Sequence, residues 1–109
     1  MSLQFLIPPS WNDDGRRAAR LGVRFKAALR ETGATKFDVD VIDMSISGFR
    51  FETAYTLHIG VRVWLTVPGF SGFESTVAWR NNHLYGCRFE APLHQAVLDH
   101  IIAQHQNLK

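Results

Sequence analysis

Apolar and polar side chains alternate along most of the chain with a period of two residues. In the stretch 23–30, Val23, Phe25, Ala27 and Leu29 alternate with mostly polar neighbours. This alternation indicates strands with one buried face. Turn-forming residues separate the stretches, and "RNN" before the last of them predicts a hairpin. The stretches that we expect to be strands are 23–30, 37–42, 49–52, 61–67, 71–79 and 83–90.

The end of the chain changes to a helical period. In "APLHQAVLDHIIAQHQ", Leu93, Val97 and Ile101 recur at helical spacing, and Pro92 suits the first position of a helix. We therefore predict a C-terminal helix over about 92–105. Short strands followed by one helix place the chain in the all-β class. They predict a small antiparallel barrel or a closed sandwich, with the helix packed on it.

The first residues have the composition of an arm. The segment 1–15 contains "PPSWNDDG", whose Pro, Asn, Asp and Gly residues favour turns and loops. We therefore predict a flexible N-terminal arm over 1–15 and a single domain over 16–109, because a chain of 109 residues can bury one modest core.

Composition narrows the class of protein. A hydrophobic content of 46% and a charged content of 20% are typical of a folded globular domain, and no apolar run is long enough to span a membrane. Cys87 alternates with Tyr85 and Phe89, which indicates a core position. One cysteine excludes an internal disulfide and favours a cytoplasmic location. A net charge of +2 is small for a protein that coats DNA, so we expect no nucleic-acid partner.

Half of the twelve Lys and Arg residues lie between residues 16 and 30. The alternation places Arg24, Lys26 and Arg30 on the outward, solvated face of the first strand. The other three precede that strand in "RRAAR": Arg16, Arg17 and Arg20. A guanidinium binds phosphate through a planar fork of donors and stacks on aromatic faces. The arginine-rich segment could therefore close over a phosphorylated, base-bearing ligand; the simpler interpretation is a solubilising arm.

A second motif is "DMSISG", which ends the second expected strand. The Asp43 carboxylate matches the pair of N–H groups on the Watson–Crick edge of guanine. Ser45 can donate to phosphate, and Gly48 can adopt a positive φ and let a ligand approach the backbone. The simpler interpretation is a turn stabilised by its Asp and Ser side chains.

The sequence gives little support for a metal site or a catalytic triad. The five histidines lack the spacing of a metal site, and a triad of Asp43, Ser45 and His58 lacks the sequence context of a nucleophile. We therefore expect neither an enzyme nor a cofactor. Aromatic residues on alternating strands are expected mainly in the core, with a stacking platform as the alternative. These residues are Trp64, Phe70, Phe73, Trp79 and Tyr85.

The order of the motifs resembles the PilZ domain family of bacteria. The resemblance rests on "RRAAR", on "DMSISG" and on "VAWRNNHLYGCRF", which ends in Gly86-x-x-Phe89. It extends from about Arg16 to the helix. It implies a six-stranded antiparallel β-barrel with a C-terminal helix that binds cyclic di-GMP, the arginine segment closing over ligand held at the "DMSISG" strand. The ligand-binding residues that it implies are Arg16, Arg17, Arg20, Asp43, Ser45 and Gly48.

The resemblance also implies how the protein acts. It predicts a non-enzymatic cyclic di-GMP receptor or adaptor that passes the change on binding to a separate protein partner. The alternative is a PilZ-like protein-interaction module that does not bind nucleotide. A third hypothesis, a weak binder of single-stranded nucleic acid, rests on the basic arm and the aromatic residues.

Overall fold

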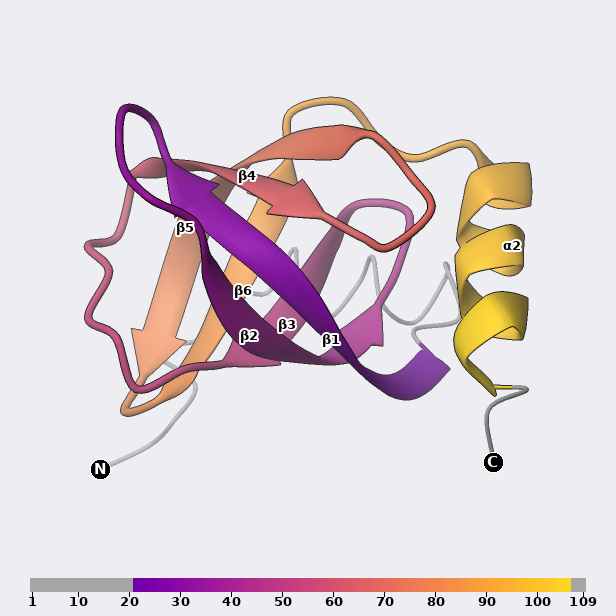
Figure 1. Ribbon diagram of the computed structural model, residues 1–109, viewed down its shortest axis with the longest axis horizontal. Helices are drawn as coiled ribbons and strands as arrows, with labels where there is room; N and C mark the ends of the chain where they lie inside the picture. The colour runs from indigo at the N-terminus through magenta and orange to yellow at the C-terminus, as the bar shows by residue number, and fades with distance from the viewer. Residues whose placement is uncertain (1–20, 107–109) are drawn as a thin grey trace.

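A computed structural model describes residues 21–106 as six strands and one helix (Figure 1). Each stretch expected to be a strand overlaps one, and the C-terminal helix is present. The elements are β1 (Leu21–Glu31), β2 (Phe37–Met44), β3 (Gly48–Glu52), β4 (Arg62–Thr66), β5 (Gly72–Asn81), β6 (Leu84–Phe89) and α2 (Gln95–Gln106).

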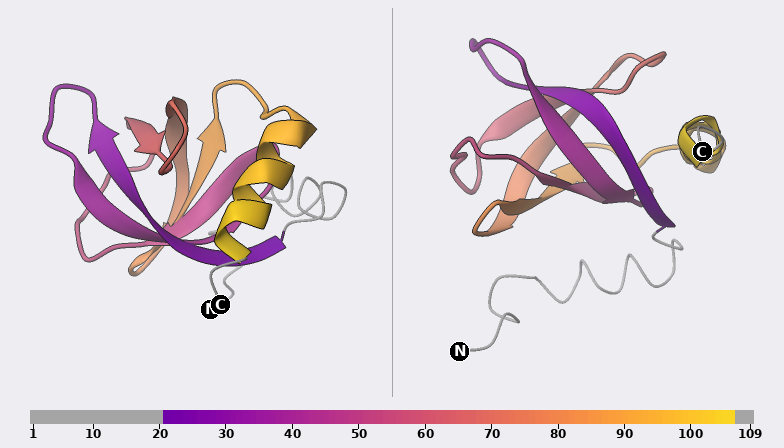
Figure 2. Two further views of the ribbon diagram at one scale, coloured as in Figure 1. Left: turned by 45° about the vertical axis from the view of Figure 1, so that its right-hand side comes forward. Right: turned by 60° about the horizontal axis from the view of Figure 1, so that its bottom comes forward.

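The strands form a closed barrel in the order β1–β2–β3–β6–β5–β4, and every neighbouring pair is antiparallel. The expected six-stranded barrel is therefore confirmed. Because successive strands alternate in direction, the β1–β2, β3–β4 and β5–β6 connections lie at one end of the barrel. The helix α2 packs against β1 at the other end, as the views in Figures 1 and 2 show.

The barrel interior is filled by the apolar residues of the alternating pattern. Phe49 and Phe51 on β3 pack beside Tyr85 on β6, with centroids of the last two rings 5.3 Å apart. Leu98 and Ile101 from α2 join the same core. The alternation therefore identified the buried face of the strands correctly, except beyond the bulges in β2 and β5 that are described below.

The helix begins later than expected. It starts at Gln95, three residues after Pro92, so the prediction that Pro92 occupies the first helical position is wrong. The His94 carbonyl instead accepts the first hydrogen bonds, from the N–H groups of Val97 at 3.0 Å and Leu98 at 3.1 Å. His94 thus sits where a helix-capping residue would.

The outward face of β1 carries the solvated cations that were expected. Lys26 Nζ lies 2.7 Å from Asp40 Oδ1, and Arg24 lies 3.6 Å from Glu52. The hydrogen bond to Asp40, together with its charge, raises the pKa of Lys26. The predicted arm over 1–15 and the three arginines of "RRAAR" lie outside the described residues. Within residues 21–106, no helix is long and apolar enough to cross a membrane.

Candidate functional site

Asp43 and Arg50 form a buried ion pair on the outer side of the barrel wall. They are register partners on β2 and β3. Arg50 Nε donates to Asp43 Oδ2 at 2.8 Å, and Arg50 Nη2 donates to the same oxygen. The Asp43 side chain is only 6% exposed and that of Arg50 26%. Asp43 Oδ1 is also buried, and it has no hydrogen-bond partner among the described residues.

A β-bulge brings Asp43 to this face. Val41 pairs with Phe51, but the next partner of Arg50 is Asp43, so Ile42 is an extra residue in β2. Strict alternation would point Asp43 inward with Val41, where an ionised carboxylate would be costly. A bulge re-aims the side chains that follow it, and here it sets the carboxylate against the guanidinium of Arg50.

The rest of "DMSISG" forms the tight connection from β2 to β3. Ser45 N–H donates to the Gly48 carbonyl at 2.8 Å, and Ser45 Oγ accepts from the Ser47 N–H at 3.2 Å. Ser45 is 2% exposed, so its hydroxyl stabilises the turn. The structure therefore brings Asp43, Ser45 and Gly48 into one short segment.

Gly48 is not in the left-handed conformation. Among the described glycines, positive φ occurs at Gly33, Gly60 and Gly69, whereas Gly48 begins β3 and pairs with Arg88 on β6. Gly48 therefore does not use the positive φ that a glycine allows. What Gly48 contributes is the absence of a side chain next to Arg88.

Asp43 and Arg50 begin a row of register partners that continues across the next two strands of the barrel wall. Arg50 is the register partner of Gly86 on β6, and Gly86 is the partner of Trp79 on β5. A second bulge, between Val77 and Trp79, precedes the tryptophan. A Cβ at Gly86 would lie 2.2 Å from Trp79 Cε2 and Nε1, so the indole lies directly over this glycine. The two bulges thus aim Asp43 and Trp79 at one outer face.

The other aromatic residues of the suggested platform do not join this row. Tyr85 is fully buried inside the barrel, and Phe70 and Phe73 pack against the core. The core interpretation is therefore correct for these three residues. Trp79 is 2% exposed but belongs to the outward set of β5, next to inward Val77.

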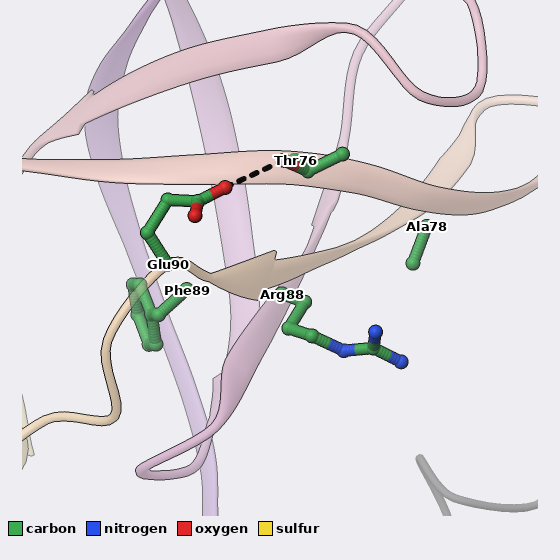
Figure 3. A pocket seen from close by; sticks show the side chains of 5 residues that line it. All are labelled: Thr76, Ala78, Arg88, Phe89 and Glu90. Carbon is green, nitrogen blue, oxygen red and sulfur yellow. Dashed lines mark hydrogen bonds between the residues drawn. The ribbon is translucent and has the colours of Figure 1, made fainter.

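A shallow pocket of about 320 Å³ lies next to the row on the outer face of β5 and β6 (Figure 3). Its lining residues are Thr76, Ala78, Arg88, Phe89 and Glu90. Thr76 Oγ1 donates to Glu90 Oε2 at 3.1 Å, and Arg62 lies 3.7 Å from the same oxygen. Figure 3 shows the Arg88 guanidinium extending away from Glu90. Within the described part of the chain, Arg88 is an exposed cation without an ion-pair partner.

Sequence reasoning missed two cations of this face. Arg50 alternates with inward Phe49 and Phe51, and Arg88 alternates with Cys87 and Phe89, so the period-two pattern could have placed both outside. Their proximity to Asp43 and Gly48 depends on the β3–β6 register, which the sequence does not reveal. Neither arginine belongs to "DMSISG" or to "RRAAR".

The remaining titratable groups offer no second chemistry. Burial raises the pKa of the Cys87 thiol, so this cysteine is a core residue rather than a nucleophile. In residues 21–106, no group of three or more His, Cys, Asp or Glu side chains is arranged to hold a metal ion. The arrangement suits binding of a ligand that carries both hydrogen-bond donors and anionic groups.

Comparison with known proteins gives one family. A family model described as the PilZ domain matches residues 14–104, which is most of the chain. No curated protein matches the chain significantly.

Proposed function

Since the chain belongs to the PilZ domain family, which is associated with cyclic di-GMP as ligand, we propose that it is a cyclic di-GMP receptor. The family consists of binding and adaptor modules, and we assign this member no catalytic step. We place it in the bacterial cytoplasm, where the ligand is made and read.

The observation that carries the proposal is the state of Asp43. One carboxylate oxygen is held by Arg50, while Oδ1 is buried and lacks a partner among the described residues. A buried acceptor without a hydrogen bond costs about 1–3 kcal/mol, and more when it is charged. Guanine offers N–H donors on its Watson–Crick edge, and a carboxylate oxygen is their complement. Guanine bound to Asp43 would relieve this cost.

The neighbouring groups suit the rest of the ligand. The ligand carries two phosphates, each with one negative charge, and Arg88 is an exposed cation on the same outer face. Gly48, its register partner, leaves that position without a side chain. Ser45 holds the connection through its hydroxyl, so we assign it first to shaping the site and second to a phosphate contact.

The arginine segment completes the proposal by family analogy. Arg16 and Arg20 are expected to close over ligand and contact its phosphates and guanines, with Arg17 as an additional phosphate contact. Ordering such a segment opposes affinity by several kcal/mol. Its ordering on binding would change the surface offered to a partner protein, which is how we propose that the signal leaves the domain.

The test is calorimetric titration of the protein with cyclic di-GMP, using GMP and cyclic di-AMP as controls. We expect heat only with cyclic di-GMP. We also expect stabilisation of about 2.7 kcal/mol at 100 times the dissociation constant. No heat and no stabilisation at about 100 μM ligand, where even micromolar affinity would show, would contradict the proposal and favour the alternative of an interaction module without a nucleotide.

A matched pair of variants tests the assigned role of the carboxylate. Asp43→Asn keeps the shape of the side chain but replaces one acceptor by a donor, so we expect at least a hundredfold loss of affinity, about 2.7 kcal/mol. Asp40→Asn is the control, because Asp40 lies on the same strand in an exposed ion pair. Circular dichroism confirms that each variant is folded. Equal affinity of the two variants would remove Asp43 from the site.

A further inference from the structure

The part of β1 before Ala28 has one strand neighbour instead of two. β1 pairs with β2 as far as Leu29, but it pairs with β4 only from Ala28 to Glu31. Outside the β1–β2 ladder, no backbone hydrogen bond joins residues 24–27 to another described residue. The edge of β1 that faces away from β2 is therefore unpaired here, and its N–H and C=O groups can pair with another strand.

A shallow pocket of about 270 Å³ lies beside this edge, where β4 ends. The residues that line it are Lys26, Ala27, Ala28, Asp38, Thr66 and Pro68. Thr66 is the last residue of β4 and the register partner of Ala28, whereas the carbonyl of Pro68 is turned to Gln104 of α2. Figure 1 shows the start of β1 extending beyond the end of β4 towards α2. The pocket thus lies where a longer β4 would continue beside β1.

The edge has two features that disfavour pairing with another molecule. Arg24 and Lys26 carry charged side chains that are 67% and 72% exposed, and the β1–β2 register shifts between Gly22 and Phe25. Exposed charges and bulges keep an edge strand from joining a strand of another chain. A strand of the same chain is less affected, because a tether raises its effective concentration to about the millimolar range. The edge therefore favours an occupant from this chain.

The chain supplies a segment that is attached next to this edge. The described part begins at Leu21, the first residue of β1, so residues 1–20 are joined to the start of the unpaired part. They contain "LQFLI", in which the apolar residues Leu3, Phe5 and Ile7 occupy alternate positions. A strand that adds to β1 needs such an apolar face, and Phe and Ile are enriched in strands.

The connection from this segment to β1 also suits a hairpin. Pro8 and Pro9 follow the segment directly, and proline ends a strand because it cannot donate to the ladder. Residues 8–20 would form the loop of an antiparallel hairpin with β1. This loop is long, and long loops are usually functional; it carries "RRAAR". When odd-numbered residues pair with odd-numbered ones, the apolar positions of the segment share the face of the buried Phe25 and Ala27.

We propose that residues 3–7 add to the unpaired edge of β1 as an antiparallel strand, in the place that a longer β4 would occupy. The segment 8–20, with "RRAAR", is then a loop whose two ends are both fixed to the barrel. The flexible part of the expected N-terminal arm narrows to residues 8–15. The pairing belongs to the free protein and needs no nucleotide.

The test is amide hydrogen exchange of the full-length protein without nucleotide, followed by NMR at residues 24–27. Successive amides of a strand point to opposite edges, so one set faces β2 and the other faces the unpaired edge. We expect both sets to be protected in the parent protein. Phe5→Pro removes a donor from the added strand, so we expect the edge-facing set to exchange at least tenfold faster and the β2-facing set to stay unchanged.

Asn12→Pro is the matched control, because it places the same residue type in the proposed loop, where proline is tolerated. We expect it to leave both sets of amides as in the parent protein. Leu29, which has β2 and β4 as neighbours, provides an internal standard of full protection. Circular dichroism checks the fold of each variant, and the measurement on the parent protein stands by itself.

Three results would overturn the proposal. The first is edge-facing amides that exchange in the parent protein as fast as in an unstructured peptide. The second is protection that survives Phe5→Pro and rises with protein concentration, together with a dimer in sedimentation equilibrium, which would assign the edge to a second copy. The third is protection that survives Phe5→Pro at every concentration, which would assign the edge to contacts within the folded domain. Because no nucleotide is present, none of these outcomes bears on cyclic di-GMP binding.

Discussion

Asp40 and Asp43 lie three residues apart on β2, and both form ion pairs, yet their environments differ sharply. Asp40 meets Lys26 on an open face, with side chains 43% and 72% exposed. Asp43 meets Arg50 with side chains 6% and 26% exposed, and one of its oxygens is left without a partner among the described residues. The difference arises from one extra residue, Ile42, in the strand between them.

The comparison teaches that burial, rather than the presence of an ion pair, distinguishes the carboxylate that we propose for the ligand site. An exposed pair gains little because water screens it. A buried carboxylate with a free acceptor is retained at a cost, which favours an additional role for it. The variants below test that distinction, from the largest expected effect to the smallest.

Asp43→Ala is expected to lower the free energy of unfolding by about 3 kcal/mol, because it leaves Arg50 partly buried without its partner. Asp40→Ala is expected to lower it by less than about 1 kcal/mol. Urea unfolding of both variants measures the difference. Similar losses in the two variants would contradict the assigned contrast between a buried and an exposed pair.

Gly86→Ala tests the row that Asp43 begins. A methyl group there would meet the Trp79 ring at 2.2 Å, so we expect a loss of about 2 kcal/mol from overpacking and a shift in tryptophan fluorescence. Gly72→Ala is the control, because its new Cβ would meet Thr66 Oγ1 at an ordinary 3.7 Å. We expect its stability to change by less than about 1 kcal/mol. A Gly86→Ala variant as stable as the control would mean that the indole moves freely.

Arg88→Ala is expected to weaken cyclic di-GMP binding about tenfold, or about 1.4 kcal/mol, and to leave stability unchanged. The reason is that Arg88 has no ion-pair partner among the described residues and lies beside Gly48. Lys26→Ala removes an equal charge from the β1 face and should leave affinity as it is. Calorimetry measures the affinity of each variant for cyclic di-GMP. If Arg88→Ala binds as tightly as the parent protein, the site is confined to the Asp43 end of the face.

The smallest expected effect is on the pH dependence of stability and comes from His105, to which we assign no ligand contact. Its ring stacks on Phe25 at 4.1 Å, and burial lowers its pKa below 6.5. The folded state therefore favours the neutral ring, so its contribution to stability is present above pH 6.5 and is lost as the pH falls below that value. Thermal unfolding between pH 8 and 5 should show a smaller decline for His105→Phe than for the parent protein. Identical pH profiles would show that His105 does not titrate with folding.

The sequence predicted the strands and their buried faces because alternation is a local property. Val39 and Val41 alternate with Asp40, and the same rule holds in β3, β4 and β6. It also identified Asp43, Ser45 and Gly48 as one segment. It could not predict the bulges at Ile42 and Ala78, since neither residue type distinguishes an extra residue from an ordinary strand position.

The residues that pair across the strands at the site were harder still to predict from the sequence. The pairing of Arg50 with Gly86, and of Gly48 with Arg88, follows from β3 lying beside β6 rather than beside β4. That order is set by closure of the whole barrel. The three-residue delay of the helix start likewise depends on a tertiary contact, the hydrogen bond from the Leu93 N–H to the Ile46 carbonyl.

Closure of the barrel also limits how any other chain can associate with it. An open sheet offers unpaired backbone groups along its edge, and an extended peptide can extend that sheet by β-augmentation. In the described barrel every strand has two neighbours, so the backbone groups left for such a peptide are confined to strand segments that extend beyond a neighbour, such as the part of β1 before Ala28, which pairs with β2 and not with β4. Elsewhere on the barrel a partner must recognise side chains, and its specificity is open to change by single substitutions that leave the barrel intact.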